Sequence, residues 1–244
     1  MTSPIPIVIF DEIDSTNAEA RRRAEAGEGG PVWFIAARQS AGRGRRGRVW
    51  DTSLGNLAAT YLFTSARAPA EVAQISFVAA LAVADLASTF APAHLVTLKW
   101  PNDTLIAGRK TAGILVESGP APGGGLWVAV GIGVNLAHAP QGLASWALPP
   151  TFLGEHGHTP TPTQALTVLS DAFERRRTIW EREGFATIAA DWTAKAHGLG
   201  ERCVARLPNE TIEGIAEGLD ADGALRLRTR GGSVRRLTAG DVFF

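Results

Sequence analysis

Cysteine and lysine are scarce in this chain, and it carries no net charge. A single cysteine, Cys203, excludes an intrachain disulfide and a multi-cysteine metal site. The 24 basic and 24 acidic residues cancel, so the excess of positive charge typical of a nucleic-acid-binding domain is missing. A content of 45% hydrophobic residues without net charge also excludes a disordered chain. The composition indicates a globular protein, and 244 residues are enough for a sizeable core.

The sequence also lacks an evident membrane anchor or export signal. No run approaches the roughly 18 apolar residues that a transmembrane helix needs. Residues 1–14 have no basic leader and turn acidic after a short apolar stretch. Together with the single cysteine, this pattern predicts a cytoplasmic protein that does not contact a membrane.

Arginine is the usual cation of this chain, and lysine is the exception. Of the 24 basic residues, 21 are Arg and only Lys99, Lys110 and Lys195 are Lys. Because an ammonium is a compact point charge that a guanidinium does not mimic, these lysines are candidates for specific roles.

The pattern of apolar residues predicts a mixed sheet with helices, followed by a smaller β unit. Short apolar, β-branched segments predict strands at 5–10, 32–37, 56–63, 95–100, 104–106, 111–117 and 126–135. Helices are expected at 18–26, 71–90, 163–182 and 185–197, with a Pro-rich connection at 138–162. A capping box of Thr16 and Glu19 is expected to start the first helix.

From about residue 200 the pattern changes to short strands separated by Pro-Asn, Asp-Gly and Gly-Gly turns, at 202–207, 211–219, 224–230 and 233–237. This is typical of a small β-barrel, which we expect to pack on the main domain because it is too small to be stable alone. The fold class is thus α/β (α+β), with a mixed-sheet domain at 1–198 and the barrel at 199–244.

Four arginines separated by glycines form the strongest local motif. Arg43, Arg45, Arg46 and Arg48 follow Gln39 without an acidic residue until Asp51. Glycines let the backbone approach a ligand, and guanidinium groups bind phosphate or carboxylate at two points. The alternatives are an RNA-binding Arg-Gly patch and a solvated loop. The position between two predicted strands favours an anion-binding loop that closes over a polyphosphate.

A second motif holds two of the three lysines. Lys99 and Lys110 each lie at the edge of a predicted strand, and Asp103 lies between them. If the segment is a β-turn-β element, the three side chains can face one cavity, where the lysines neutralise phosphate charge and Asp103 holds Mg²⁺ or orients an amine. The alternative is a tight turn with surface charges.

Two motifs carry weaker signals. The usual role of Ser15-Thr16-Asn17 at a strand-to-helix junction is capping. Gly131-Ile-Gly-Val-Asn135 permits close backbone approach and ends in an Asn that can read an adenine edge. It is not a dinucleotide fingerprint, because no third Gly and no helix follow.

Three other clusters have simple interpretations. The segment Glu155-His-Gly-His158 predicts a surface loop, because its spacing specifies no metal. Arg175-Arg-Arg177 predicts a solvated helix face, and Cys203 predicts a small core residue.

In series, these motifs resemble those of the biotin–protein ligases, which attach biotin to a carrier domain of biotin-dependent carboxylases. The resemblance covers essentially the whole chain and implies that the C-terminal barrel is SH3-like. It rests on Ser15-Thr16-Asn17, Gly42-Arg-Gly-Arg-Arg-Gly-Arg48 with Trp50, Lys99-Trp-Pro-Asn-Asp103, Arg109-Lys110 with Gly113, and Gly131-Ile-Gly-Val-Asn135.

The resemblance implies a role for each matching residue. The biotin ring would be held by Ser15, Thr16, Asn17 and Gln39. Closure over biotin and the acyl-phosphate would involve Arg43, Gly44 and Arg45. The phosphates would be contacted by Arg45, Arg48, Lys99 and Lys110, with Lys110 also on the biotin carboxylate. The adenine would be read by Asn135, Trp50 would line the apolar wall, and Asp103 would place Mg²⁺ or the incoming lysine amine.

The implied reaction uses ATP and Mg²⁺ to convert biotin into biotinyl-5′-AMP, followed by transfer to a lysine of a biotin carboxyl carrier protein domain. Family members that also repress transcription carry a DNA-binding domain ahead of the catalytic one. The first catalytic strand here begins near Ile5, so we expect no repressor role and no nucleic-acid partner, while a homodimer is plausible for the family. The alternatives are a lipoate or octanoate ligase of related fold, a nucleic-acid-binding module, and a non-catalytic paralogue.

Overall fold

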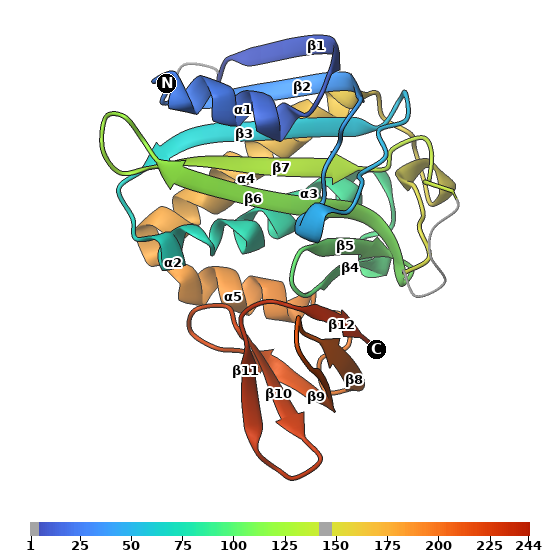
Figure 1. The fold of residues 1–244 in the computed structure, drawn as a ribbon. Coiled ribbons are helices and arrows are strands. Elements are labelled where there is room, and N and C mark those ends of the chain that lie inside the picture. Colours follow the sequence, from blue (N-terminus) through green and yellow to red (C-terminus); the bar gives the residue numbers. More distant parts are fainter. Residues whose placement is uncertain (1–4, 142–147) are drawn as a thin grey trace.

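The structure, a computed structural model, describes residues 5–141 and 148–244. Within them, a seven-stranded mixed sheet with flanking helices is followed by a five-stranded antiparallel sheet (Figure 1). The strands of the first sheet are β1 (Ile7–Ile13), β2 (Val32–Gln39), β3 (Leu57–Ser65), β4 (Val96–Lys99), β5 (Asp103–Ile106), β6 (Arg109–Pro120) and β7 (Leu126–Val134). The helices are α1 (Thr16–Glu25), α2 (Pro69–Val72), α3 (Ile75–Phe90), α4 (Pro162–Glu183) and α5 (Phe185–Ala194).

The strand order of the first sheet is β1-β2-β3-β7-β6-β5-β4. β1 and β2 run parallel, because α1 carries the chain back between them. The other neighbouring strands are antiparallel, and α2 and α3 connect β3 to β4 at the far edge of the sheet. The predicted mixed sheet is therefore confirmed, although the segment predicted as one helix at 71–90 forms two helices, α2 and α3.

Helices cover the two faces of this sheet unequally. α3 and α4 lie behind it in Figure 1, over a core that includes Tyr61 and Phe173. α1 covers part of the opposite face, where Ala20 packs in a second core with Phe34 and Leu62. Beyond α1, this face of β6 and β7 has no helix over it among the described residues, and the cavity discussed below lies there.

α3 is the most apolar helix, and its segment corrects the expectation that no stretch of the sequence is long and apolar enough for a transmembrane helix. Residues 69–90 contain an 18-residue window that is hydrophobic enough to qualify as a membrane span by length and composition. In the structure, 67% of that window is buried, since α3 packs between the sheet, α4 and α5. The high hydrophobicity of this segment is therefore explained by its position in the core of the domain.

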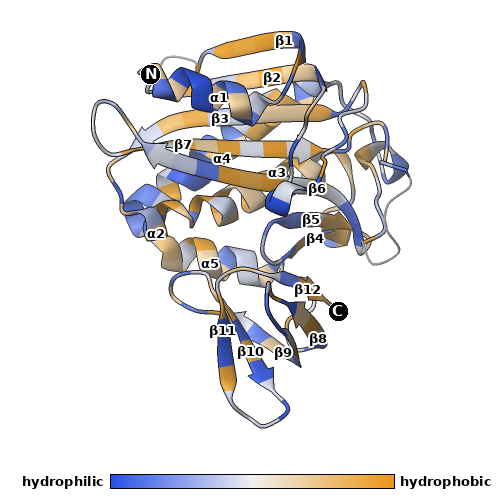
Figure 2. Cartoon of the chain, in the orientation of Figure 1, coloured by the Kyte–Doolittle hydropathy of each residue, from blue (hydrophilic) through white to orange (hydrophobic). Residues whose placement is uncertain are grey.

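The C-terminal sheet has the order β11-β10-β9-β8-β12, all antiparallel. Four of its strands match the predicted ones, and the fifth, β12, was not predicted. The strands are β8 (Arg202–Arg206), β9 (Thr211–Leu219), β10 (Leu225–Thr229), β11 (Val234–Leu237) and β12 (Asp241–Phe243). Figure 2 shows hydrophilic stretches on β10 and β11, where Arg226 and Arg236 face each other across the ladder.

The C-terminal sheet packs on the first domain, as expected for so small a unit. Cys203, buried as predicted, and Val242 belong to the same hydrophobic core cluster as Leu98 and Trp100. The Trp100 indole N–H donates to the Gly223 carbonyl at 3.2 Å. The two units therefore share one core cluster and a direct hydrogen bond.

Two local predictions were wrong because tertiary contacts compete for the side chains. Ser15, not Thr16, is the N-cap of α1, and its side chain makes no capping bond. The arginines at 176 and 177 are half-buried rather than solvated. Arg176 forms ion pairs with Asp85 of α3 and Asp191 of α5, which tie three helices together.

Candidate active site

A cavity of about 790 Å³ lies on the open face of the sheet, and every predicted site residue lines it. Strand ends, the N-terminus of α1 and the Arg-rich loop all contribute. The thirteen residues that the sequence placed in the site are Ser15, Thr16, Asn17, Gln39, Arg43, Gly44, Arg45, Arg48, Trp50, Lys99, Asp103, Lys110 and Asn135. Segments that lie far apart in the sequence therefore converge on one site.

Glycines form the floor of the cavity. Gly113 of β6 pairs with Gly133 of β7 in the ladder, and the Trp50 ring lies against both. A Cβ added at Gly133 would come within 2.2 Å of that ring, and one at Gly113 within 2.9 Å. A Cβ at Gly131 would come within 2.1 Å of Asn17 Oδ1. The glycines are thus required for close approach, and Trp50 forms an apolar wall as predicted.

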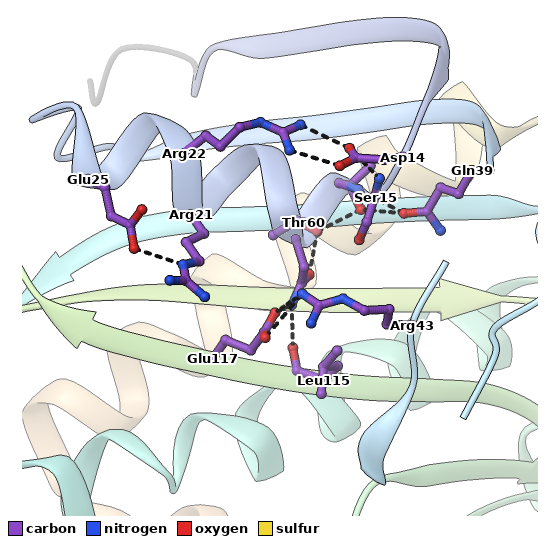
Figure 3. A network of polar contacts seen from close by, with 12 residues as sticks. Asp14, Ser15, Arg21, Arg22, Glu25, Gln39, Arg43, Thr60, Leu115 and Glu117 are labelled. Atoms are coloured by element: carbon purple, nitrogen blue, oxygen red, sulfur yellow. Dashed lines mark hydrogen bonds and ion pairs between the residues drawn. The ribbon is translucent and has the colours of Figure 1, made fainter. Parts of the chain in front are cut away.

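A hydrogen-bonded network forms one end of the cavity, at the N-terminus of α1 (Figure 3). Gln39 Oε1 accepts from the Thr16 backbone N–H at 2.8 Å and from its hydroxyl at 3.1 Å. The Thr60 hydroxyl lies 2.8 Å from that of Thr16 and 2.7 Å from Asn17 Oδ1. Asn17 Nδ2 donates to the Glu117 carboxylate at 2.9 Å. This end therefore presents fixed donors and acceptors beside an apolar floor.

The opposite end of the cavity is cationic. Lys110 Nζ lies 2.6 Å from Asp103 Oδ1 and 5.7 Å from the centre of the Trp50 ring. Lys99 is only 6% exposed, and among residues 5–141 and 148–244 no carboxylate lies within ion-pair distance of it. Burial lowers the pKa of Lys99, an effect that nearby Asp103 partly opposes. A buried ammonium without a close counter-ion is a site for an anion.

The Arg-rich loop, residues 42–48, lies beside this cationic end. Arg45 donates to Asn102 Oδ1 at 3.1 Å, and burial lowers its pKa. Arg43 reaches back to Glu117 at 3.1 Å. Arg46 has a φ of 57°, which turns the loop sharply within a short 3-10 turn, Arg45–Gly47. The loop is thus folded over the cavity.

The structure adds residues to the site that the sequence did not indicate. Glu117 receives both Asn17 and Arg43, Thr60 joins the polar network, and Asn102 holds Arg45. Asp241 of β12 lines the cavity and pairs with Arg46 at 2.9 Å and with Arg48. No local motif marks Thr60 or Asp241, whereas Asn102 and Glu117 lie inside segments that were already of interest.

Asn135 lies at the end of β7 and is 3% exposed. Its Nδ2 donates to the Thr151 carbonyl at 3.0 Å, and its backbone N–H donates to Thr111. The predicted Pro-rich connection at 138–162 closes this side of the cavity through Pro140, Leu148 and Pro150. Its residues 142–147 lie outside the described part of the chain.

The carboxylates of the cavity fit a magnesium ion delivered with a nucleotide. The described residues hold no group of three His, Cys, Asp or Glu that could bind a metal. Mg²⁺ needs only one or two carboxylates when phosphates and water supply the other ligands. Asp103 is a cavity carboxylate of this kind, which lies beside Lys99 and Lys110. Glu155 instead pairs with Arg109, and His156 lies 2.7 Å from the Thr151 hydroxyl.

Comparison with known proteins identifies the family of this fold and site. Residues 9–135 match the model described as the biotin/lipoate A/B protein ligase family, and residues 198–244 match the biotin protein ligase C terminal domain. The chain belongs to the biotin/lipoate A/B protein ligase family.

Relatives in this family are similar to the chain over its whole length. A biotin--[acetyl-CoA-carboxylase] ligase of Paracoccus denitrificans is 46% identical over 95% of this chain and 97% of its own. A ligase of the same name from Mycobacterium tuberculosis is 33% identical over 96% of this chain and 87% of its own. The fold is that of the biotin protein ligase of Aquifex aeolicus in complex with biotin and ATP, with a TM-score of 0.80, 23% identity, and coverage of 98% and 97%.

Proposed function

We propose that this chain is an ATP-dependent biotin–protein ligase, which makes biotinyl-5′-AMP and then biotinylates a lysine of a carrier protein. The observation that carries this function is the cavity itself. A fixed hydrogen-bonding end and a cationic end, with the buried Lys99, lie at opposite ends of one apolar glycine floor. The similarity to biotin--[acetyl-CoA-carboxylase] ligases over nearly the whole chain supports it.

The polar end fits the ureido ring of biotin. This ring offers two N–H donors and one carbonyl acceptor, and Ser15, Thr16, Asn17 and Gln39 provide both kinds of partner. The glycine floor and Trp50 accommodate the apolar part of the molecule. Biotin bound in this orientation extends its carboxylate toward Lys110.

In the first step, a biotin carboxylate oxygen attacks the α-phosphorus of ATP, and pyrophosphate leaves. Lys99, Lys110, Arg45 and Arg48 stabilise the negative charge that develops on the phosphates, and they hold both reactants in line. Mg²⁺ bound to the phosphates, with Asp103 as a protein ligand, would neutralise further charge. Asn135 would read the adenine edge.

In the second step, the neutral amine of a carrier lysine attacks the acyl carbon, and AMP leaves with the electrons of the C–O bond. The amine loses a proton and an amide remains. Arg43, Gly44 and Arg45 cover the adenylate until the carrier arrives, which keeps water from hydrolysing it. If Asp103, the carboxylate beside Lys110, does not hold Mg²⁺, it would instead orient the incoming amine.

The alternatives fit the site less well. Three of the four loop arginines, at 43, 46 and 48, are paired with the carboxylates of Glu117 and Asp241, so part of the loop's positive charge is compensated within the chain, which disfavours a nucleic-acid-binding patch. The network around Thr16 and Asn17 would supply hydrogen-bond partners for a ureido ring. Lipoate and octanoate have no ureido ring, so a ligase for either of them would not need this network.

The wider setting belongs to the same proposal. The partner would be the biotin carboxyl carrier domain of a carboxylase, in the cytoplasm, with no membrane, no operator DNA and a possible homodimer. Residues 1–198 would form the biotin- and ATP-binding domain, and residues 199–244 the small C-terminal domain. Sedimentation measures the dimer, and a gel shift at physiological salt measures DNA binding.

The intact mass of a carrier domain tests the proposed function. The carrier is incubated with the protein, ATP and Mg²⁺, with biotin, lipoate or octanoate in parallel tubes. We expect one biotinyl group on one lysine, in the biotin tube alone. Lipoyl or octanoyl transfer would contradict the substrate, and no transfer in any tube would contradict the activity.

A further inference from the structure

Asp241 connects the C-terminal sheet to the Arg-rich loop of the first domain. Its Oδ2 lies 2.9 Å from Arg46 and also contacts Arg48, and its side chain is 20% exposed. Arg46 and Asp241 are 195 positions apart in the sequence. Two guanidinium groups therefore converge on one carboxylate oxygen at the rim of the cavity.

The strand that carries Asp241 is firmly held. β12 pairs with β8, and Val242, the next residue, is fully buried. The C-terminal sheet shares a core cluster with the first domain. Trp100, in the turn that carries Asn102, donates to the Gly223 carbonyl. Asp241 is consequently a fixed point relative to the floor of the cavity.

The Arg-rich loop, in contrast, depends on polar contacts for its position. In its 3-10 turn, Arg45–Gly47, Arg46 and Gly47 are exposed and Arg45 is half-buried, and the neighbouring Val49 is 85% exposed. Its side-chain contacts include Arg43 to Glu117, Arg45 to Asn102, and Arg46 and Arg48 to Asp241. Segments with few buried apolar contacts open at low free-energy cost. Each of these polar contacts therefore contributes a large share of the free energy that keeps the loop closed.

We propose that Asp241 is a positioning residue, which holds Arg46 and Arg48 so that the Arg-rich loop stays closed over the reaction intermediate. The C-terminal sheet thereby contributes one carboxylate to the closure of a site that lies in the first domain. Asp241 acts through the two arginines and does not touch the reacting atoms. The expected consequence, retention of the adenylate, rests on the proposed function.

The substitution Asp241→Asn tests the inference, because it removes the charge and keeps the shape. Its matched control is Asp222→Asn, since Asp222 pairs with Arg236 on the same sheet and does not line the cavity. Hydrogen–deuterium exchange of residues 42–50 reports the loop directly. We expect faster exchange there in Asp241→Asn, in the unliganded protein and with biotin and ATP, and no change in Asp222→Asn.

The consequence is measured as biotinyl-AMP and its hydrolysis products released without carrier. We expect release to rise on the order of threefold to tenfold in Asp241→Asn, the range for losing two half-exposed ion pairs. Biotin affinity without ATP is expected to stay within about twofold, and Asp241→Glu, which keeps the charge, is expected to restore most of the retention.

A double-mutant cycle with Arg46→Gln separates a direct effect from general loosening. If Asp241 acts through Arg46, the fold increase of the exchange rate in the double variant is smaller than the product of the fold increases in the two single variants. Unchanged exchange at residues 42–50, or faster exchange with unchanged release, would overturn the inference. Failure of the wild type to make any adenylate would instead overturn the proposed function. The exchange rate of residues 42–50 would still test whether Asp241 holds the Arg-rich loop in place.

Discussion

Lys110 Nζ lies 2.6 Å from Oδ1 of Asp103, across neighbouring strands at the cationic end of the cavity. The ladder between β5 and β6 shifts register between Thr104 and Leu105, next to this pair. The carboxylate keeps the ammonium inside the site while no anion is bound. In the proposed first step, Lys110 would then bind a phosphate without moving far.

Removing the Lys110 amine is expected to stop the first step. Lys110→Ala should lower the rate of adenylate formation by about 100-fold or more, as for the loss of one preorganised charge at a transition state. Pyrophosphate release measures this rate. Lys195→Ala is the control, because Lys195 caps the end of α5 and does not line the cavity. Wild-type release by Lys110→Ala would exclude the role.

Replacing Lys99 is expected to stabilise the protein and impair its use of ATP. Burial lowers the pKa of Lys99 from its usual value of 10.5, so folding disfavours the charged form. This cost is full below the lowered pKa and disappears as the pH rises to the unfolded value. Lys99→Met should therefore unfold at higher urea concentration at pH 7, and its advantage should shrink as the pH approaches 10.5.

The same variant should have a higher KM for ATP, on the order of tenfold, since hydrogen bonds to a charged group are lost. The KM for biotin should change much less. Equal effects on both substrates would contradict the assignment of Lys99 to the phosphates, and a stability advantage that does not depend on pH would contradict the lowered pKa of Lys99.

Gly131 is expected to tolerate no side chain. Gly131→Ala places a Cβ 2.1 Å from Asn17 Oδ1, which displaces the amide that bonds to Thr60 and Glu117. Because overpacking costs about 1–3 kcal/mol, biotin affinity should fall by about tenfold or more. Calorimetric titration measures it. Gly123→Ala is the control, since a Cβ there meets no described atom within 4 Å, and a normal affinity of Gly131→Ala would place biotin elsewhere.

Asp14 is expected to make stability depend on pH in acid. Its hydrogen bonds with Arg22 lower its pKa from 3.8 to about 2. A lowered carboxyl pKa stabilises the fold above the unfolded value, and this contribution is lost as the pH falls through the folded value. Asp14→Asn should cost about 1 kcal/mol at pH 7, a figure reduced for solvent exposure.

Urea unfolding of both proteins between pH 7 and pH 2 checks this. The difference in free energy of unfolding should shrink from pH 4 downward and be small at about pH 2. A difference that is the same at both ends of the range would exclude the ionised pair as its cause.

The sequence predicted the parts of the site that are local in the chain. Lys99, Asp103 and Lys110 lie on three successive antiparallel strands joined by short turns, so their convergence follows from strand pairing alone. Short apolar, β-branched segments likewise predicted the strands of the first sheet. These features depend on neighbours within a few residues, which a pattern can register.

The contacts that the sequence did not predict depend on chain packing. Arg43 meets Glu117 across 74 positions, and Arg46 meets Asp241 across 195. No local motif marks Asp241, and the segment that ends in Glu117 does not indicate Arg43 as its partner. The capping prediction for Thr16 was wrong because Gln39 of β2 binds its hydroxyl. Arg176 was predicted in solvent because a helical pattern does not show that two other helices place Asp85 and Asp191 beside it.

Biotin-dependent exchange of labelled pyrophosphate into ATP, measured without a carrier protein, tests the central claim most directly. The account predicts exchange with ATP, Mg²⁺ and biotin, no exchange without biotin, and none in Lys110→Ala. This result would show that the cavity around Lys110 and Asp103 makes a free acyl-adenylate. Exchange that requires the carrier, or that proceeds with lipoate or octanoate and not with biotin, would contradict it.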